Sequence, residues 1–364
     1  MKKRKSSLNI AALRLPVQLV SSAALLYLGT LGLKLVTVFG MALAVPTFSC
    51  HYIDNRFVNC ALYELQFRLP QVLDPATWRS ALAALGALLL MFAVSVGVLG
   101  RAWCGWVCPL GLLQDLLTRV RVLLRLPAAD LSERWRAGLR TAKYVLVAAT
   151  VLLLLSIGAP RFFMARYRLD FDLAYCQICP SKKFLSGMSK LHTLQATSPR
   201  EFSRSLATAF PYVAFVDDMT PITTVMSWLA MGTGILFLAG SWAVRRFWCR
   251  ICPLGALMGF CARFALLSLR KEGVRCTKCG ICRRVCPTQV QMVYQEKDAR
   301  NVMEEGCILC LRCVELCPER DCLTAKLGPL TVLGSSPDVF FDASPCGGRV
   351  RAVPPDPVRR KTGA

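Results

Sequence analysis

The chain has 364 residues, a formal net charge of +23 and 19 cysteines, and 54% of its residues are hydrophobic. Its mean hydropathy of +0.45 is well above that of a soluble globular domain. Several long uncharged segments explain this value, since each can cross a bilayer core of about 30 Å. The positive charges cluster beside these segments, as membrane topology predicts. We therefore expect a membrane protein and exclude nucleic acid as a partner.

Four apolar segments predict membrane helices, although Lys34 interrupts the first of them. They lie within residues 15–45, 80–100, 144–160 and 222–244. The basic tail of residues 1–14 and the basic residues after the second and fourth segments place both chain termini in the cytoplasm. The first segment is long enough to be retained rather than cleaved as a signal peptide. The expected location is the bacterial inner membrane, with several membrane passes.

An internal repeat follows the second and the fourth predicted helices. Arg101-Ala-Trp-Cys-Gly-Trp-Val-Cys-Pro-Leu-Gly aligns with Arg246-Phe-Trp-Cys-Arg-Ile-Cys-Pro-Leu-Gly when one residue is deleted. A unit of two helices preserves orientation, so we expect parallel repeats about an axis along the membrane normal. Such repeats would bring four cysteines together on the cytoplasmic side, Cys104, Cys108, Cys249 and Cys252. They would bring four others together on the outer side, Cys50, Cys60, Cys176 and Cys179.

Four thiolates are the ligand count of one [4Fe–4S] cluster. For the cytoplasmic set, the alternatives are an iron–sulfur cluster, a structural zinc ion or thiols without metal, because a reducing compartment disfavours disulfides. For the outer set, the alternatives are disulfides and a second membrane cluster. Three further cysteines fit no site and are interpreted as thiols, namely Cys261, Cys322 and Cys346.

The strongest motif is Cys-x2-Cys-x2-Cys-x3-Cys-Pro, which occurs at residues 276–287 and again at residues 307–318. In two-cluster ferredoxins the fourth cysteine of each run ligates the other cluster. One [4Fe–4S] cluster is therefore assigned to Cys276, Cys279, Cys282 and Cys317. The other is assigned to Cys307, Cys310, Cys313 and Cys286. Zinc favours two separated cysteine pairs rather than this run.

These patterns predict a membrane all-α domain over residues 15–271, with four transmembrane helices in two parallel repeats. A small α+β ferredoxin-like cytoplasmic domain with two [4Fe–4S] clusters follows over residues 272–325. The apolar segments 110–126 and 254–269, which are dotted with arginines, are predicted as helices that lie in the membrane interface or pack on the protein. Residues 326–364 are predicted to be a disordered tail.

The two W-C-x2–3-C-P-L-G motifs combined with a doubled ferredoxin motif resemble the NapH-type membrane polyferredoxins. This group of 4Fe-4S ferredoxin-type membrane proteins includes the membrane part of NosR, the MauN-type proteins and the YccM-like proteins. The resemblance covers residues 15–325 and places Cys104, Cys108, Cys249 and Cys252 at the family's motif positions. It implies electron transfer between the quinone pool or a cytoplasmic donor and a periplasmic enzyme.

Three functions compete. The first is an electron-transfer subunit that relays electrons through its clusters between quinol or a cytoplasmic donor and a partner redox enzyme. The second is a maturation factor that supplies electrons to assemble a periplasmic metalloenzyme, and the third is a redox sensor. The sequence has no nucleophile–base constellation, nucleotide-binding glycine motif or flavin signature. We therefore expect an electron carrier rather than a stand-alone enzyme, with membrane lipid, redox proteins and quinone as partners.

Overall fold

The computed structural model describes residues 10–27, 50, 60–158, 174–189, 221–296 and 301–337. The chain divides into two compact units. The larger unit contains residues 14–267 and, from the second ferredoxin motif, the short segment 304–310. The smaller unit contains residues 268–303 and everything from residue 311 onward, together with residues 1–13.

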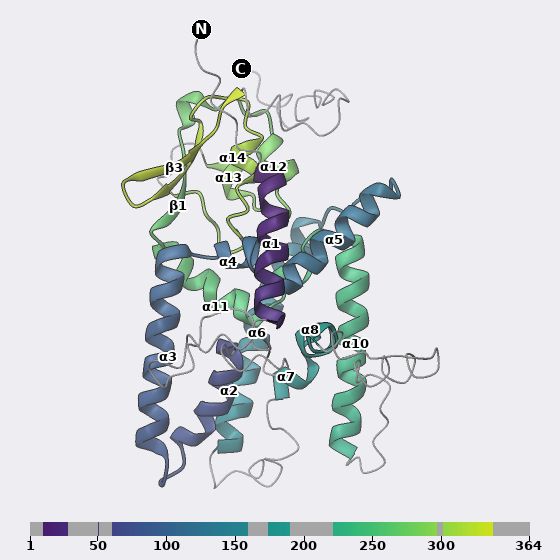
Figure 1. Ribbon diagram of the computed structural model, residues 1–364, viewed down its shortest axis with the longest axis vertical. Helices are drawn as coiled ribbons and strands as arrows, with labels where there is room; N and C mark the ends of the chain where they lie inside the picture. Colours follow the sequence, from purple (N-terminus) through teal and green to yellow (C-terminus); the bar gives the residue numbers. More distant parts are fainter. Residues whose placement is uncertain are drawn as a thin grey trace. The chain divides into compact units, whose positions relative to one another are not determined.

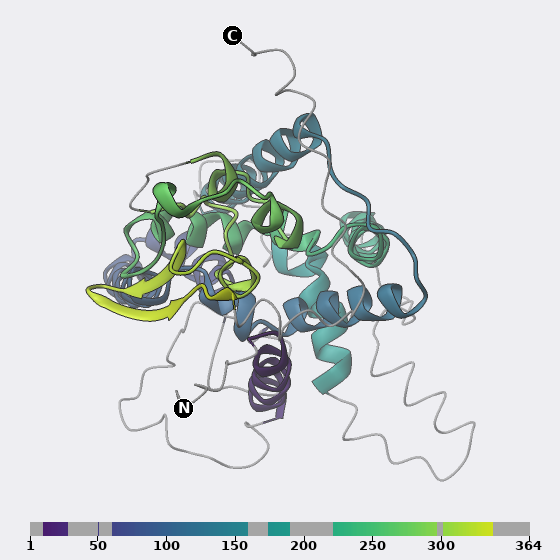
Figure 2. The ribbon, with the colours of Figure 1, turned by 90° about the horizontal axis from the view of Figure 1, so that it is seen from above.

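Three helices in the described residues are long and apolar enough to cross a membrane. They are α3 (Trp78–Leu99), α6 (Glu133–Gly158) and α10 (Pro221–Ala243). The 22 residues of α3 rise about 33 Å, which matches a bilayer core. Seen from above, α3 and α10 appear end-on (Figure 2). Large apolar side chains such as Leu90 and Trp228 are exposed on these helices, as expected of surfaces that face lipid.

The bounds of these helices agree with the predictions for the second and fourth segments to within two residues. The third helix begins at Glu133 rather than at residue 144, because its basic first turns continue the helix. The first prediction, residues 15–45, lies mostly outside the described residues. Its described part belongs to α1 (Ile10–Tyr27), whose buried polar side chains Arg14 and Gln18 face the protein. A fourth membrane helix therefore stays a prediction.

Helix α2 (Ala61–Val72) packs along α3 and is joined to it by a short turn (Figure 1). Its 12 residues rise about 18 Å, roughly half the rise of α3. Cys60 is the N-cap of α2 and therefore lies about halfway along α3 rather than at its outer end. A hydropathy pattern alone does not reveal this position of Cys60.

Each repeated Cys-Pro motif starts a helix, because proline at the first helical position has no N–H to lose. The first copy contains α4 (Ala102–Trp106) and starts α5 (Pro109–Leu123). The second contains the 3₁₀ turn η4 (Trp248–Arg250) and starts α11 (Pro253–Cys261). The prediction of a helix over residues 254–269 was too long, because a second 3₁₀ turn, η5 (Ala262–Phe264), and strand β1 (Leu267–Lys271) follow α11.

Two further short helices, α7 (Ala174–Ile178) and α8 (Pro180–Ser189), belong to the larger unit and pack against α10. They are separated only by Cys179, so the Cys-Pro pair again starts a helix. The same local sequence therefore produces the same break in the helix at three places in this unit.

The smaller unit is an α+β fold around the ferredoxin motifs. Strands β1, β2 (Leu323–Leu327) and β3 (Leu330–Gly334) form one sheet in that order, and β2 pairs with β3 antiparallel. Short helices surround the motifs, namely η6 (Gly273–Arg275), α12 (Ile281–Val285), α13 (Met292–Gln295) and α14 (Arg312–Glu315).

The predicted disordered tail was wrong for its first part. Residues 326–334 belong to the β2–β3 hairpin, and Ser335 holds the hairpin's end. Its carbonyl accepts from the Asp321 N–H at 2.8 Å, and its N–H donates to the Leu323 carbonyl at 2.9 Å. The prediction failed because Gly328, at φ +58°, makes a tight turn between two short strands instead of a linker. Residues 338–364 lie outside the described residues.

Candidate metal centres

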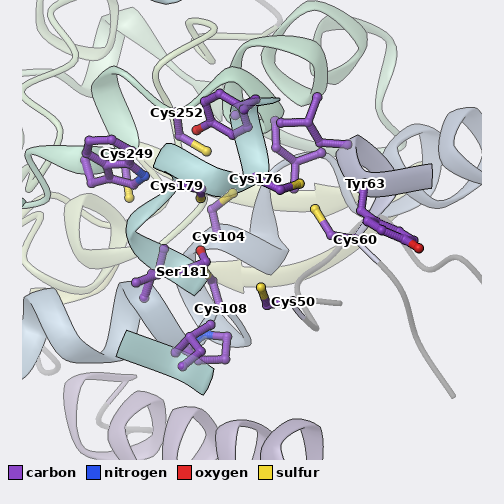
Figure 3. A pocket seen from close by; sticks show the side chains of 18 of the residues that line it. Cys50, Cys60, Tyr63, Cys104, Cys108, Cys176, Cys179, Ser181, Cys249 and Cys252 are labelled. Atoms are coloured by element: carbon purple, nitrogen blue, oxygen red, sulfur yellow. The ribbon is translucent and has the colours of Figure 1, made fainter. Parts of the chain in front are cut away.

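Eight cysteines of the larger unit line a single cavity (Figure 3). They come from four separate stretches of chain, and the structure records them as thiols rather than disulfides. We call Cys50, Cys60, Cys176 and Cys179 the re-entrant quartet. We call Cys104, Cys108, Cys249 and Cys252 the repeat quartet.

Neighbouring thiols connect the two quartets. Cys176 has all three other members of the re-entrant quartet as electrostatic neighbours. Cys252 has Cys104 and Cys249 of its own quartet as neighbours, and also Cys179 of the re-entrant quartet. The quartets were predicted to lie on opposite sides of the membrane, and this was wrong. Both line one cavity, because α2 and α7 bring the re-entrant cysteines inward.

Residues 175–180 contain a third copy of the repeated motif, which the sequence reasoning missed. Tyr175-Cys-Gln-Ile-Cys-Pro differs from Trp248-Cys-Arg-Ile-Cys-Pro only in the aromatic residue and in one residue between the cysteines. The alignment of the two halves by their longer motifs concealed this match. The signal was present in the sequence, and it makes the two quartets chemically alike.

Cys60 and Cys108 occupy matching positions in the two quartets. Each is the N-cap of a helix, with φ −63° and ψ 130° at Cys60 and φ −62° and ψ 119° at Cys108. The carbonyl of each accepts a helical hydrogen bond, from Glu64 at 3.1 Å and from Leu112 at 3.0 Å. The backbone therefore presents both thiols from the start of a helix in the same conformation.

The arginines of the repeated motifs reach across to the opposite copy. Arg101 donates to the Cys249 carbonyl at 3.3 Å, and Arg246 donates to the Cys104 carbonyl at 2.8 Å. Both side chains are buried. Arg246 is balanced by Asp115, with 2.8 Å between Nε and Oδ1, whereas Arg101 makes no ion pair with a carboxylate in the described part of the chain. Arg101 lines the cavity as a buried positive charge.

Asp115 on α5 also forms an ion pair with Arg14 and accepts a hydrogen bond from Gln18 at 3.1 Å. Burial tends to raise the pKa of this carboxyl, but the charges of Arg246 and Arg14 outweigh burial, so its pKa lies below the ordinary value. Asp115 is therefore an anion that joins α1 to the second repeated motif.

Residues 304–310 pack into the larger unit. Arg101 donates to the Glu305 carbonyl, and the Trp106 indole N–H donates to the Leu309 carbonyl at 2.9 Å. Cys310 is buried in the same hydrophobic core as Cys104. This loop of the second ferredoxin motif is thus held by the first repeated motif.

The Glu305 side chain fastens the same loop to α6. Its carboxylate lies 3.1 Å from Arg140 Nε and 3.4 Å from Lys143 Nζ, and it accepts a hydrogen bond from Tyr144. Burial tends to raise the pKa of this carboxyl, but Tyr144 and the two cations outweigh it, so the pKa lies below its ordinary value.

The smaller unit has a second cysteine-lined pocket. Four of the predicted ligands line it, Cys276, Cys279, Cys282 and Cys317, and Cys322 lines it with them. Burial raises the pKa of the Cys282 thiol to about 11, and the Lys271 charge opposes this. Cys322 was interpreted from its spacing as a thiol outside any site, whereas the fold places it, 2% exposed, beside the predicted ligands.

The other predicted set is divided, since Cys307 and Cys310 belong to the larger unit and Cys286 and Cys313 to the smaller one.

The large cavity has the chemistry that an iron–sulfur cluster requires. Its volume is about 90 Å³, several times the roughly 10–15 Å³ that one water molecule needs. Its thiols are the ligands that such clusters use. Arg101 has an Nε with no hydrogen-bond partner among the described residues, and a buried guanidinium fits a group that carries net negative charge. Eight thiols are the ligand count of two [4Fe–4S] clusters.

Two family models match the chain. A 4Fe-4S binding domain matches residues 80–127 and again residues 224–275, which contain the two repeated motifs. A 4Fe-4S dicluster domain matches residues 268–318, which contain both ferredoxin motifs. The chain therefore carries iron–sulfur binding domains in both of its units.

Curated relatives match over most of the chain. The putative electron transport protein YccM of Escherichia coli is 27% identical over 248 residues, which cover 67% of this chain and 56% of YccM. The uncharacterized protein MJ0750 of Methanocaldococcus jannaschii is 24% identical, over 70% of this chain and 83% of MJ0750. The ferredoxin-type protein NapH of Haemophilus influenzae is 24% identical, over 79% of this chain and 85% of NapH. No solved structure gives a significant match.

Proposed function

We propose that this chain, which belongs with the ferredoxin-type membrane proteins that include YccM, NapH, MauN and NosR, relays electrons through four [4Fe–4S] clusters to or from a partner redox enzyme. A [4Fe–4S] cluster exchanges single electrons at a potential that its protein surroundings set. The observation that carries the proposal is the cavity lined by eight thiols in the larger unit. The residues of this chain bind the clusters, keep water away from them and supply compensating charge.

The ligands divide into four sets of four. In the smaller unit, one cluster takes Cys276, Cys279, Cys282 and Cys317, a set supported by the pocket that these four line. The second takes Cys286, Cys307, Cys310 and Cys313, as the crossed pattern of two-cluster ferredoxins predicts. The repeat quartet and the re-entrant quartet would each hold one membrane cluster, supported by their shared motif and cavity.

The packing of residues 304–310 supports an order for the relay. These residues carry Cys307 and Cys310, and Cys310 shares a hydrophobic core with Cys104 of the repeat quartet. Electrons would therefore pass between the cluster of Cys307 and Cys310 and the repeat quartet, and from there to the re-entrant quartet about halfway along α3.

The membrane arrangement is part of the proposal. Four membrane helices in two parallel repeats, with both termini and the ferredoxin domain in the cytoplasm of a bacterial inner membrane, agree with the distribution of basic residues. A relay that enters the bilayer from the cytoplasm and stops about halfway needs an outer partner, either quinone or a redox protein. A partner on that side would complete the path across the membrane.

Iron and acid-labile sulfide per chain, with EPR of the reduced protein, test the proposal. We expect about 16 Fe per chain, and about 8 Fe would restrict the clusters to the ferredoxin motifs. Cys176→Ser should lower the count by about 4 Fe, since it removes one ligand of the re-entrant quartet. Cys261→Ser is the matched control, because Cys261 lines neither cysteine pocket, and it should leave the count unchanged.

A second function, supply of electrons for maturing another metalloenzyme, shares the same clusters. A relative, the methylamine utilization ferredoxin-type protein MauN of Methylorubrum extorquens, is 26% identical over 57% of this chain, and its name ties a ferredoxin-type protein to one metabolic system. Deletion separates the two functions. An electron-transfer subunit leaves an intact partner enzyme that artificial reductants can drive, whereas a maturation factor leaves the partner inactive with every reductant.

A further inference from the structure

Two glutamines in the larger unit make the same three hydrogen bonds at the two quartets. Gln66 on α2 donates to the Leu62 carbonyl at 3.1 Å and to the Cys176 sulfur at 3.1 Å. Its Oε1 accepts from the backbone N–H of Tyr175 at 3.0 Å. The side chain is 2% exposed, so the amide is fixed by its partners rather than by solvent.

Gln114 on α5 repeats this pattern at the other quartet. It donates to the Leu110 carbonyl at 3.2 Å and to the Cys249 sulfur at 3.7 Å. Its Oε1 accepts from the backbone N–H of Trp248 at 3.0 Å. It is 1% exposed. In each case the side-chain amide accepts a hydrogen bond from the backbone N–H of the residue before a cysteine and donates one to the sulfur of that cysteine.

The two glutamines also stand at corresponding places in the chain. Each lies on the helix that a cysteine of its own quartet caps, at the same distance in sequence from that cysteine, which is Cys60 for Gln66 and Cys108 for Gln114. The two pairs are not aligned with each other in the internal repeat, since both lie in the first half of the chain. Their agreement in three bonds each is therefore a separate observation from the repeat.

We propose that Gln66 and Gln114 are matched positioning residues, each of which orients one cysteine ligand and raises the reduction potential of one membrane cluster by donating an N–H to its sulfur. This inference deepens the proposed function and rests on it. Reduction adds negative charge to a cluster and its thiolates, so a donor aimed at sulfur stabilises the reduced form more than the oxidised form. In a buried site without competing water this preference is larger than it would be at the surface.

The same geometry argues that the re-entrant quartet is a metal site rather than a pair of disulfides. A thiolate ligand accepts a hydrogen bond well, and orienting amides around metal ligands are a regular feature of metal sites. A disulfide sulfur carries no charge, so it is a weak acceptor for a hydrogen bond from a buried amide. Each glutamine would then raise the reduction potential of its own membrane cluster, and the two effects would be separate.

The test is an EPR-monitored redox titration of the anaerobically purified full chain. Gln66→Met should lower the midpoint potential of one membrane signal, and Gln114→Met should lower that of the other, each without loss of iron. We expect about a tenfold fall in the ratio of reduced to oxidised cluster at fixed potential, which equals about 59 mV for a one-electron couple. Gln66→Glu and Gln114→Glu keep an oxygen that accepts the backbone N–H, and they should lower the potential in the same direction if the methionine variants fold poorly.

Gln18→Met is the matched control. Gln18 is also 2% exposed, and its amide donates to the Gly105 carbonyl at 2.9 Å and to Asp115 rather than to a sulfur. Its variant should leave both membrane potentials nearly unchanged. Potentials that do not move in a fully loaded Gln66 or Gln114 variant would overturn this inference alone. A wild-type protein with only the ferredoxin clusters would overturn it together with the membrane part of the proposed function.

Discussion

Arg246 of the second repeated motif donates to the backbone carbonyl of Cys104 in the first motif, with 2.8 Å between Nη1 and O. Arg101 of the first motif makes the corresponding bond to Cys249 in the second. Each guanidinium passes over a glycine of the opposite Cys-Pro-Leu-Gly segment, Gly111 beneath Arg246 and Gly255 beneath Arg101. The two repeated motifs are therefore joined by reciprocal hydrogen bonds, and the position of the repeat quartet depends on both arginines.

A methyl group at Gly111 should break this arrangement. A Cβ there would collide with the guanidinium of Arg246 and lie 3.0 Å from the Cys104 carbonyl oxygen. We expect Gly111→Ala to lower the free energy of unfolding by about 1–3 kcal/mol, as overpacking does, and to reduce iron bound at the repeat quartet. Thermal unfolding in detergent and iron content measure both effects.

Gly97→Ala is the control for this substitution. Gly97 lies in α3, and a Cβ there meets nothing within 4 Å. Alanine favours a helix by up to about 1 kcal/mol over glycine, so this variant should be at least as stable as the wild type. Equal stability and equal iron in both variants would show that Arg246 adapts to the methyl group, and the glycine would then have no packing role.

Asp115 should be required for the charge balance around Arg246. Asp115→Asn leaves Arg246 buried without its anion, and the loss of one partner of a buried ion pair costs about 3–5 kcal/mol. The pKa of Asp115 is lowered in the folded protein, so its contribution is present above the carboxyl's unfolded pKa and is lost as the pH falls through the lower folded value. Unfolding curves between neutral and acidic pH should show this loss in the wild type.

The Asp115→Asn variant provides the comparison for that pH dependence. It lacks the titrating carboxyl, so its stability should be lower at neutral pH and should vary less than that of the wild type at acidic pH. Leu123→Asn, at an 81% exposed position on the same helix, controls for a polar substitution in α5. An Asp115→Asn protein as stable as the wild type at neutral pH would contradict the assigned charge balance.

Gly105 should control the docking of residues 304–310. A Cβ at Gly105 would collide with the Ile308 carbonyl, which belongs to the backbone and cannot rotate away. We expect Gly105→Ala to increase amide hydrogen exchange across residues 304–310 by at least about tenfold, corresponding to about 1.4 kcal/mol of lost local stability. It should also slow electron exchange between the ferredoxin and membrane clusters without removing iron.

Gly86→Ala is the control for the docking variant, since a Cβ at Gly86 meets nothing within 4 Å. It should leave exchange across residues 304–310 at the wild-type rate. Unchanged exchange and unchanged electron transfer in Gly105→Ala would show that the loop is not a junction of the relay.

The sequence was most informative where local patterns decide the structure. Long uncharged runs located α3 and α10 closely, because the length of a membrane span follows from bilayer thickness. The apolar segments 110–126 and 254–269 located the starts of α5 and α11 to within one residue, and each start follows a Cys-Pro pair because proline suits the first turn. The doubled ferredoxin spacing placed Cys276, Cys279 and Cys282 together, since a run of closely spaced cysteines can surround one pocket.

What escaped the sequence depends on packing between distant segments. The position of Cys60 follows from the antiparallel packing of the 12-residue helix α2 against the longer helix α3. No sequence pattern near Cys60 predicts that packing. Gln66 and Gln114 look like ordinary helical residues until the fold sets a cysteine opposite each. Cys322 joins the ferredoxin pocket because the β2 strand begins beside it, a contact that spacing from Cys317 does not specify.

Cys322 tests the ligand assignment in the smaller unit, because five thiols line a pocket where four ligands suffice. Cys322 is fixed against Glu272, since its carbonyl accepts from the Glu272 N–H at 2.9 Å and its thiol donates to the Glu272 carbonyl at 3.8 Å. We expect Cys322→Ser to retain full iron, because the four assigned ligands remain, while the EPR signal of that cluster shifts because a sulfur that lines the same pocket is replaced by oxygen. Cys282→Ser should instead lose iron, since it removes one of the four assigned ligands. Loss of about 4 Fe in Cys322→Ser would show that Cys322, and not Cys317, is the fourth ligand, and the crossed assignment of the two ferredoxin motifs would have to be revised.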